Sequence, residues 1–251
     1  MNLAHVERYF ADALSGMESR TPVLPNLVED NGWWRLRAGG PRLIPLPRNL
    51  FVIGTVNVDE TTYMFSPKVL DRGNTIEFRV ATDDLRVDAL KPTPVTPGEA
   101  LLVKGFLAAA TDDNFQVAQP SSNRDEVAEK LRDLHRALSR YGFEWAHRTF
   151  YEMLRYAALL EACGETDQWA ALDQQVKQKV LPHFHGSAQR LTRPLAVVAR
   201  FCFDLGIDDE HEAGSFVVGD VSTDAALPQS FDKVRRMTGT LLENHFTGFA
   251  E

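Results

Sequence analysis

Cysteine, positive charge and long apolar runs are all scarce in this sequence, and each shortage excludes a class of protein. The 251 residues include only two cysteines, which lie far apart; this excludes a disulfide scaffold and favours a reducing cytoplasm. The 27 Lys and Arg are outnumbered by 35 Asp and Glu, and the formal charge of −8 disfavours a surface that binds nucleic acid throughout. No apolar run approaches the roughly 18 residues of a membrane span, and no secretory signal is recognisable, so we expect no membrane association.

A loop that binds nucleotide phosphates is also missing. The pattern Gly-x-x-x-x-Gly-Lys-Ser/Thr, whose backbone N–H groups hold the β-phosphate, occurs nowhere in the sequence. What is present is an ordinary globular composition, with 44% hydrophobic and 25% charged residues, enough to bury a core in one large domain or two small ones. Disorder and a collagen-like structure are thereby excluded.

The first part of the chain carries the patterns of an α/β structure. Apolar residues at steps of three and four predict an amphipathic helix that begins almost at residue 1. Asn31-Gly32 predicts a hairpin turn. A short apolar run over Leu50–Ile53 predicts a strand covered on both faces, as in a parallel sheet.

A short helix and a second strand are predicted next. A capping Ser66, a proline at the first helical position and a glycine in a left-handed turn after the end predict a helix over residues 67–72, with Arg72 at its end. Strict alternation over residues 75–80 predicts a half-buried strand whose even-numbered apolar residues face inward and whose odd-numbered polar residues face outward.

The rest of the chain is predicted to be helical. Residues 83–120 are rich in proline and predict a linker with one or two strands around the apolar segment 101–107. From residue 121 onward, five apolar stripes at helical spacing predict a bundle. We therefore predict two domains, an α/β part over residues 1–120 and an all-helical part over residues 121–251.

Four residues receive specific expectations within the helical part. Pro194 is expected in the first turn of the fourth helix, where proline is tolerated, and Ser230 is expected to cap the last helix. Cys163 and Cys202 fall on apolar stripes and are expected in the core.

Asn57 is the first candidate for chemistry. It ends a predicted buried strand, so it lies where ligands bind in α/β folds, and its amide can hold an attacking water against a phosphate. A second interpretation is that Asn57 only caps the next turn. A third treats residues 56–60 as a Walker B motif, with Asp59 on magnesium and Glu60 polarising water, although Asn57 interrupts the apolar run before these acids.

Several segments, in order, resemble one family. Residues 49–62, 66–72 and 75–78 look like the sensor 1 strand, the arginine-finger helix and the last core strand of McrB-type AAA+ NTPases, the motor subunits of methylation-dependent restriction systems. Residues 148–152 are similar to the lid segment with the sensor 2 arginine, and residues 179–187 to a later lid signature.

The two ends of the chain extend this resemblance. Residues 1–10 look like the segment that follows the Walker B acids, and residues 248–251 look like the usual end of such chains. The resemblance implies the C-terminal part of an AAA+ (P-loop NTPase) α/β core over residues 1–120 and an all-helical lid over residues 121–251. Because both Walker motifs are missing, it implies the back half of an AAA+ subunit.

The resemblance also implies roles for three residues. Asn57 would be sensor 1, and Arg72 would be the arginine finger that reaches the nucleotide of a neighbouring subunit. Arg148 would be sensor 2, which contacts nucleotide and reports its state to the lid. The fuel would be GTP or ATP with Mg²⁺, bound weakly or not at all by this chain alone. For Arg72 and Arg148 the alternative is a surface arginine on a helix.

Two functions follow as expectations. In the first, the chain is part of a McrB-like nucleoside triphosphatase that acts in DNA restriction and does not hydrolyse nucleotide by itself. In the second, it is a non-hydrolysing interaction subunit that supplies Arg72 in trans to a complete AAA+ partner. Expected partners are AAA+ ring neighbours of the same or another chain, a McrC-like nuclease subunit and, through that complex, DNA.

Other candidates are weaker. His183 and His185 stand two residues apart, but no cysteine or acid stands at ligand spacing, so we expect no metal site there. Trp33 and Trp34, with arginines nearby, suit stacking on a nucleobase, but a packed hairpin is the favoured interpretation.

Overall fold

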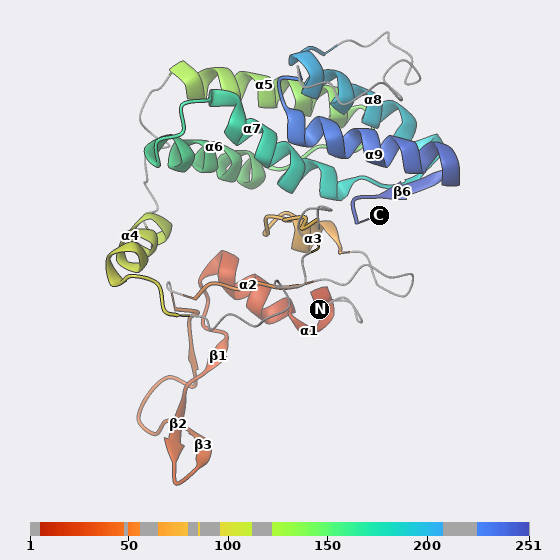
Figure 1. The fold of residues 1–251 in the computed structure, drawn as a ribbon. Helices are drawn as coiled ribbons and strands as arrows, with labels where there is room; N and C mark the ends of the chain where they lie inside the picture. Colours follow the sequence, from red (N-terminus) through yellow and green to blue (C-terminus); the bar gives the residue numbers. More distant parts are fainter. Residues whose placement is uncertain are drawn as a thin grey trace. The chain divides into compact units, whose positions relative to one another are not determined.

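The computed structural model describes residues 6–47, 50–55, 65–79, 85, 96–111, 122–207 and 225–250 (Figure 1). Contacts divide the chain into two compact units, residues 1–69 and 70–251. The domain boundary predicted near residue 120 lies outside the described residues.

Where the structure describes it, the first unit consists of short helices and small antiparallel sheets. The predicted N-terminal helix is confirmed as α1 (Val6–Tyr9) and α2 (Ala11–Ser19). Strand β1 (Leu24–Pro25) pairs with β4 (Leu43–Ile44), and β2 (Leu27–Asp30) pairs with β3 (Trp33–Leu36). The predicted hairpin turn is confirmed: Asn31 and Gly32 have φ values of 53° and 80°, as a two-residue type I′ turn requires.

The prediction of a strand over Leu50–Ile53 is wrong. The structure gives these residues no strand and exposes all four side chains, with Ile53 91% exposed. A strand needs a neighbour that pairs with its backbone and covers its faces, and the described residues supply none to this run. The apolar run therefore remains an exposed patch of the first unit.

The helix predicted over residues 67–72 is shorter than expected. Helix α3 spans Pro67–Leu70, and Arg72 lies in the turn that follows. Ser66 does not cap it through its side chain, because Oγ is buried without a hydrogen-bond partner among the described residues. Gly73 lies outside the left-handed region, and its N–H donates to the Leu70 carbonyl at 3.3 Å.

A helix replaces the strand expected around residues 101–107. Helix α4 spans Ala100–Thr111. Its sequence is dominated by alanine and leucine, which have high helix propensity, and this outweighs the influence of the prolines that precede it. The prolines correctly indicated a loop before residue 100, but they did not indicate the helix that follows it.

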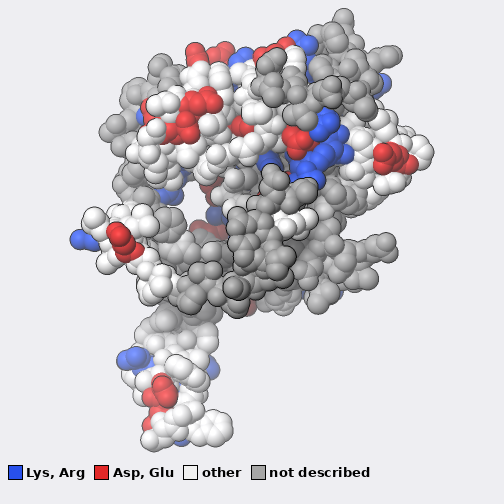
Figure 2. Space-filling model, in the orientation of Figure 1, with Lys and Arg blue, Asp and Glu red and all other residues white. Residues whose placement is uncertain are grey.

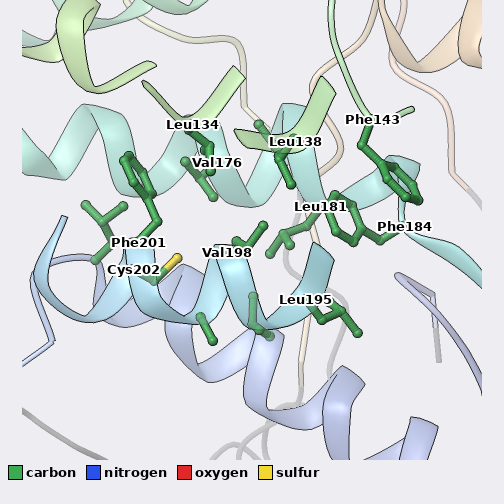
Figure 3. Close-up of a cluster of buried hydrophobic side chains, with 14 of the residues drawn as sticks. Leu134, Leu138, Phe143, Val176, Leu181, Phe184, Leu195, Val198, Phe201 and Cys202 are labelled. Atoms are coloured by element: carbon green, nitrogen blue, oxygen red, sulfur yellow. The ribbon is translucent and has the colours of Figure 1, made fainter. Parts of the chain in front are cut away.

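The second unit is built on a bundle of long helices, as the apolar stripes predicted. These are α5 (Ser122–Ser139), α6 (His147–Ala162), α7 (Gln168–Gln175), α8 (Ala188–Asp204) and α9 (Pro228–Asn244). Side chains of α5 and α8 point toward one another in the core, with Phe143 and Phe184 stacked at one end (Figure 3). Cys202 is buried in this core as expected, but Cys163 is exposed at the end of α6.

Two expectations about helix starts in the bundle are corrected. Pro194 lies inside α8, in its second turn, because the helix already begins at Ala188. Ser230 lies in the first turn of α9, behind Pro228 at its start. The capping group is Asp173 of α7, whose carboxylate accepts the N–H groups of Gln229 at 2.9 Å and Ser230 at 2.7 Å.

A small sheet joins the start of α8 to the end of α9. Strand β5 (His185–Ser187) pairs antiparallel with β6 (Phe246–Gly248), next to the start of α8 and the end of α9. In the part of the chain that the structure describes, no helix combines the length and the apolar character needed to cross a bilayer.

Candidate functional site

The candidate site is built around a π-helix between α7 and β5. The π-helix η3 spans Val176–Val180 and is followed by a 3₁₀ turn, η4 (Leu181–His183). Pro182 has no N–H to donate to the carbonyl of Gln178 four residues earlier, and its ring crowds that carbonyl. The proline therefore explains why the regular helix ends here and why the Gln178 carbonyl is available to another segment.

Three successive residues of η3 bind one segment of the chain, residues 71–77. The Lys177 Nζ lies 3.7 Å from Glu77 Oε2, and the Gln178 carbonyl accepts the N–H of Thr75 at 3.1 Å. The Lys179 Nζ donates to the backbone carbonyl of Asp71 at 3.2 Å. We call residues 71–77 the docked segment, because the helical bundle of the same unit holds it through backbone and side-chain contacts along its length.

Glu77 is the strongest anchor of the docked segment. Lys233 of α9 donates to its Oε1 at 2.7 Å, and Arg236 binds both oxygens, at 3.1 and 2.9 Å. Burial alone would raise the pKa of Glu77, but the hydrogen bonds from Arg236 and Lys233 and their charges hold that pKa at about 2. Glu77 is therefore ionised at neutral pH.

Lys233 depends on Glu77 for its charge balance. Its side chain is fully buried, and its Nζ lies 4.5 Å from the centre of the Phe249 ring. Burial lowers the pKa of Lys233, against the opposing effect of Glu77. Asp232 binds Arg236 in turn, and Lys and Arg side chains gather beside acidic ones over α9 in Figure 2.

The docked segment reverses the faces predicted for residues 75–80. No strand forms over residues 75–79, and the polar residues Thr75 and Glu77 face the bundle. The expected inner residues Ile76 and Phe78 are exposed, Phe78 by 91%. Odd and even residues do lie on opposite sides of this segment. The ion pairs of Glu77 turn the polar side toward the bundle, and the described residues provide no sheet to cover the apolar side.

Two of the three predicted site residues approach the same ion network. Arg148 of α6 donates from Nε to Glu152 Oε1 at 3.0 Å, and Lys179 donates to Glu152 Oε2 at 2.6 Å. Lys179 also binds the carbonyl of Asp71, so the network ends at the residue before Arg72. The Arg72 residue is half-buried. The third predicted residue, Asn57, lies outside the described residues, as do Asp59 and Glu60.

Sequence reasoning missed the residues that connect Arg148 to Arg72. Glu152 and Lys179 stand inside residues 148–152 and 179–187, the two segments that resemble lid motifs, but nothing in the local pattern pairs them. Glu77 and Lys233 are 156 residues apart, so no local pattern joins them. The signal that was available is Pro182, whose place in a helical stripe indicates a broken helix with a free carbonyl.

His183 and His185 have different partners. The His183 Nε2 lies 3.5 Å from Asp71 Oδ1, and burial lowers the pKa of His183 although Asp71 opposes this. The His185 ring packs edge-on against Phe246 at 4.8 Å. Within the described ranges, no group of three or more His, Cys, Asp or Glu side chains is arranged to hold a metal ion.

The tryptophan hairpin of the first unit is not packed as expected. Trp33 and Trp34 are 71% and 68% exposed. They alternate along β3, so they lie on opposite faces of a two-stranded sheet, which has no core of its own to bury them.

Comparison with known families gives one match. Residues 103–246, more than half of the chain, match the family described as "Domain of unknown function (DUF8727)". The chain belongs to this family. The span matched by DUF8727 includes Arg148, Glu152 and the π-helix, whereas the docked segment and Arg72 precede it. No curated protein and no solved structure matches the chain.

Proposed function

We propose that this protein supplies the arginine finger and the lid of a McrB-like AAA+ NTPase that acts in DNA restriction in the cytoplasm. Arg72 presents its guanidinium to a GTP or ATP molecule, with Mg²⁺, that is held mainly by another part of the assembly. Arg148 contacts the nucleotide from the lid. A McrC-like nuclease uses the resulting motion on DNA. The α/β core of this proposal is the AAA+ core sheet, to which residues 1–120 contribute.

The observation that carries the proposal is the attachment of the Arg72 segment to the bundle that bears Arg148. An arginine finger must be held rigidly to act on a developing charge, because a poorly placed donor does not stabilise a transition state. The docked segment meets this need: it is fastened at Asp71, directly before Arg72, and at Thr75 and Glu77, three and five residues after it.

The described residues fit only part of a nucleotide site. Arg72 and Arg148 suit contacts to phosphate, because a guanidinium offers planar paired donors. The sequence has no phosphate-binding loop, and the Nε of Arg148 is engaged by Glu152. We therefore derive no hydrolytic step from this chain alone and assign the phosphate loop to the rest of the assembly.

The test compares two arginines in the native assembly. The full chain carries a C-terminal tag in the cells it comes from, and the isolated assembly is assayed for hydrolysis of GTP and ATP with Mg²⁺. Arg72→Ala is expected to lower the rate by about 10³-fold or more, because this is the range for an arginine finger. The control is Arg79→Ala, an exposed arginine shortly after the docked segment. Equal rates for the two variants would refute the proposal.

A further inference from the structure

The two carboxylate oxygens of Glu152 bind two different cations, and one of these cations also contacts the docked segment. Oε1 accepts from Arg148 at 3.0 Å, and Oε2 accepts from Lys179 at 2.6 Å. Lys179 donates a second bond to the carbonyl of Asp71 at 3.2 Å. A continuous series of contacts therefore runs from Arg148 to the backbone next to Arg72.

The members of this series differ in burial. The Lys179 side chain is 2% exposed, that of Glu152 is 30% exposed and that of Arg148 is 38% exposed. A buried ammonium needs its counter-ion, so Glu152 cannot leave Lys179 without a large cost. The pair of Arg148 and Glu152 is more exposed and one helical turn apart, so it breaks easily. Arg148 is thus the member that can turn to another anion.

We propose that Glu152 is a positioning residue that makes the attachment of Arg72 depend on what Arg148 binds. This inference rests on the proposed function. When Arg148 turns to a phosphate group, Glu152 loses one of its two cations and attracts Lys179 more strongly. Lys179 then holds the Asp71 carbonyl less tightly, and the docked segment loosens. Nucleotide read by the lid in this way alters the finger that serves the neighbouring nucleotide.

The same contacts link the two segments that resemble the lid. Glu152 follows Arg148 by one turn of α6, and Lys179 belongs to η3, where the Gln178 carbonyl also holds Thr75. A change at Lys179 therefore reaches two attachment points of the docked segment through one short helix.

Hydrogen exchange of the Thr75 amide is the readout, since this N–H bonds the Gln178 carbonyl. The assembly is first compared without nucleotide. Arg148→Gln is expected to speed exchange in the docked segment about twofold, because an exposed pair is lost. Glu152→Gln is expected to slow it, because the neutral amide draws Lys179 away from the Asp71 carbonyl less strongly than the carboxylate does. Exchange in α8 should stay unchanged.

The matched control is Glu161→Gln. Glu161 lies on the same helix, is exposed and pairs with Arg124 at 3.5 Å, away from the docked segment. This variant should leave the Thr75 amide unchanged. An unchanged amide in Arg148→Gln, or an equal change in Glu161→Gln, overturns the inference. If Glu152→Gln does not fold, Arg148→Gln still decides.

The second comparison adds a slowly hydrolysed analogue of GTP or ATP with Mg²⁺. Nucleotide should speed exchange at Thr75 in the wild type, and this response should be absent in Glu152→Gln although the nucleotide still binds. A response that persists in Glu152→Gln overturns the inference and leaves the proposed function standing. An assembly that binds no nucleotide refutes the proposed function and, with it, this inference.

Discussion

Replacing Glu77 by glutamine tests how the docked segment is held. The carboxylate loses its charge but keeps its shape, so the contacts with Lys233 and Arg236 weaken without a change in volume. Its contacts with Lys233 and Arg236 hold the pKa of Glu77 at about 2, below its ordinary value of 4.5. Because water partly screens this carboxylate, the ionised form stabilises docking by about 1 to 3 kcal/mol, a factor of about 10 to 100 in the docking equilibrium.

The assay is again the exchange of the Thr75 amide, corrected at each pH for the rate of an unstructured amide. At neutral pH, Glu77→Gln should lower the protection of this amide about 10- to 100-fold, or to the unprotected rate if docking is weaker than that. The folded pKa lies below the unfolded one, so the stabilisation is present above pH 4.5 and disappears as the pH falls toward 2. The variant and the wild type should therefore converge in acid.

A second variant separates charge pairing from shape. In a chain that already carries Lys233→Met, no buried ammonium is left unpaired. Glu77→Gln should therefore lower the protection of the Thr75 amide clearly less in that chain than in the wild type. The reasoning is refuted if protection is unchanged in Glu77→Gln, if the difference is the same at every pH, or if Lys233→Met leaves that loss of protection unaltered.

Three further outcomes follow from the structure. Asp173→Ala should lower the free energy of unfolding by about 1 to 2 kcal/mol in urea titrations, because the N–H groups of Gln229 and Ser230 lose their cap; no change would count against the capping role. A thiol reagent should label exposed Cys163 quickly and Cys202 only on unfolding, since burial raises the pKa of Cys202 well above its usual value; fast labelling that survives Cys163→Ser would contradict this. In NMR titrations His183 should protonate below pH 6.5, because burial lowers its pKa, and its neutral form stabilises the fold increasingly less as the pH falls below 6.5; a midpoint above that value would show that Asp71 dominates.

The helices were predictable because their signal is local. Apolar residues at steps of three and four placed α5 to α9 correctly, since a bundle buries one stripe of each helix. The hairpin turn at Asn31 was equally local, because the dipeptide itself determines the backbone conformation. Cys163 shows the limit of this reasoning: a stripe continues to the end of α6, where the helix no longer faces the core.

The strands and the ion network were not predictable in the same way. An apolar run such as Leu50–Ile53 indicates which side chains a strand would bury. Whether the strand forms depends on a pairing partner elsewhere in the chain. The attachment of Glu77 depends on Lys233 and Arg236 from the far end of the chain. Local alternation gave the two faces of residues 75–79, and only the distant cations decide which face is held.

The central claim is that the bundle holds Arg72 in place to stabilise the transition state of nucleotide hydrolysis. Its most direct test measures nucleotide affinity and single-turnover hydrolysis on the same assembly with Arg72→Ala. Since a finger acts on charge that develops during the reaction, we predict that hydrolysis falls by about 10³-fold or more while affinity changes little. Affinity lost in proportion to rate, or a rate that does not change, would contradict the account.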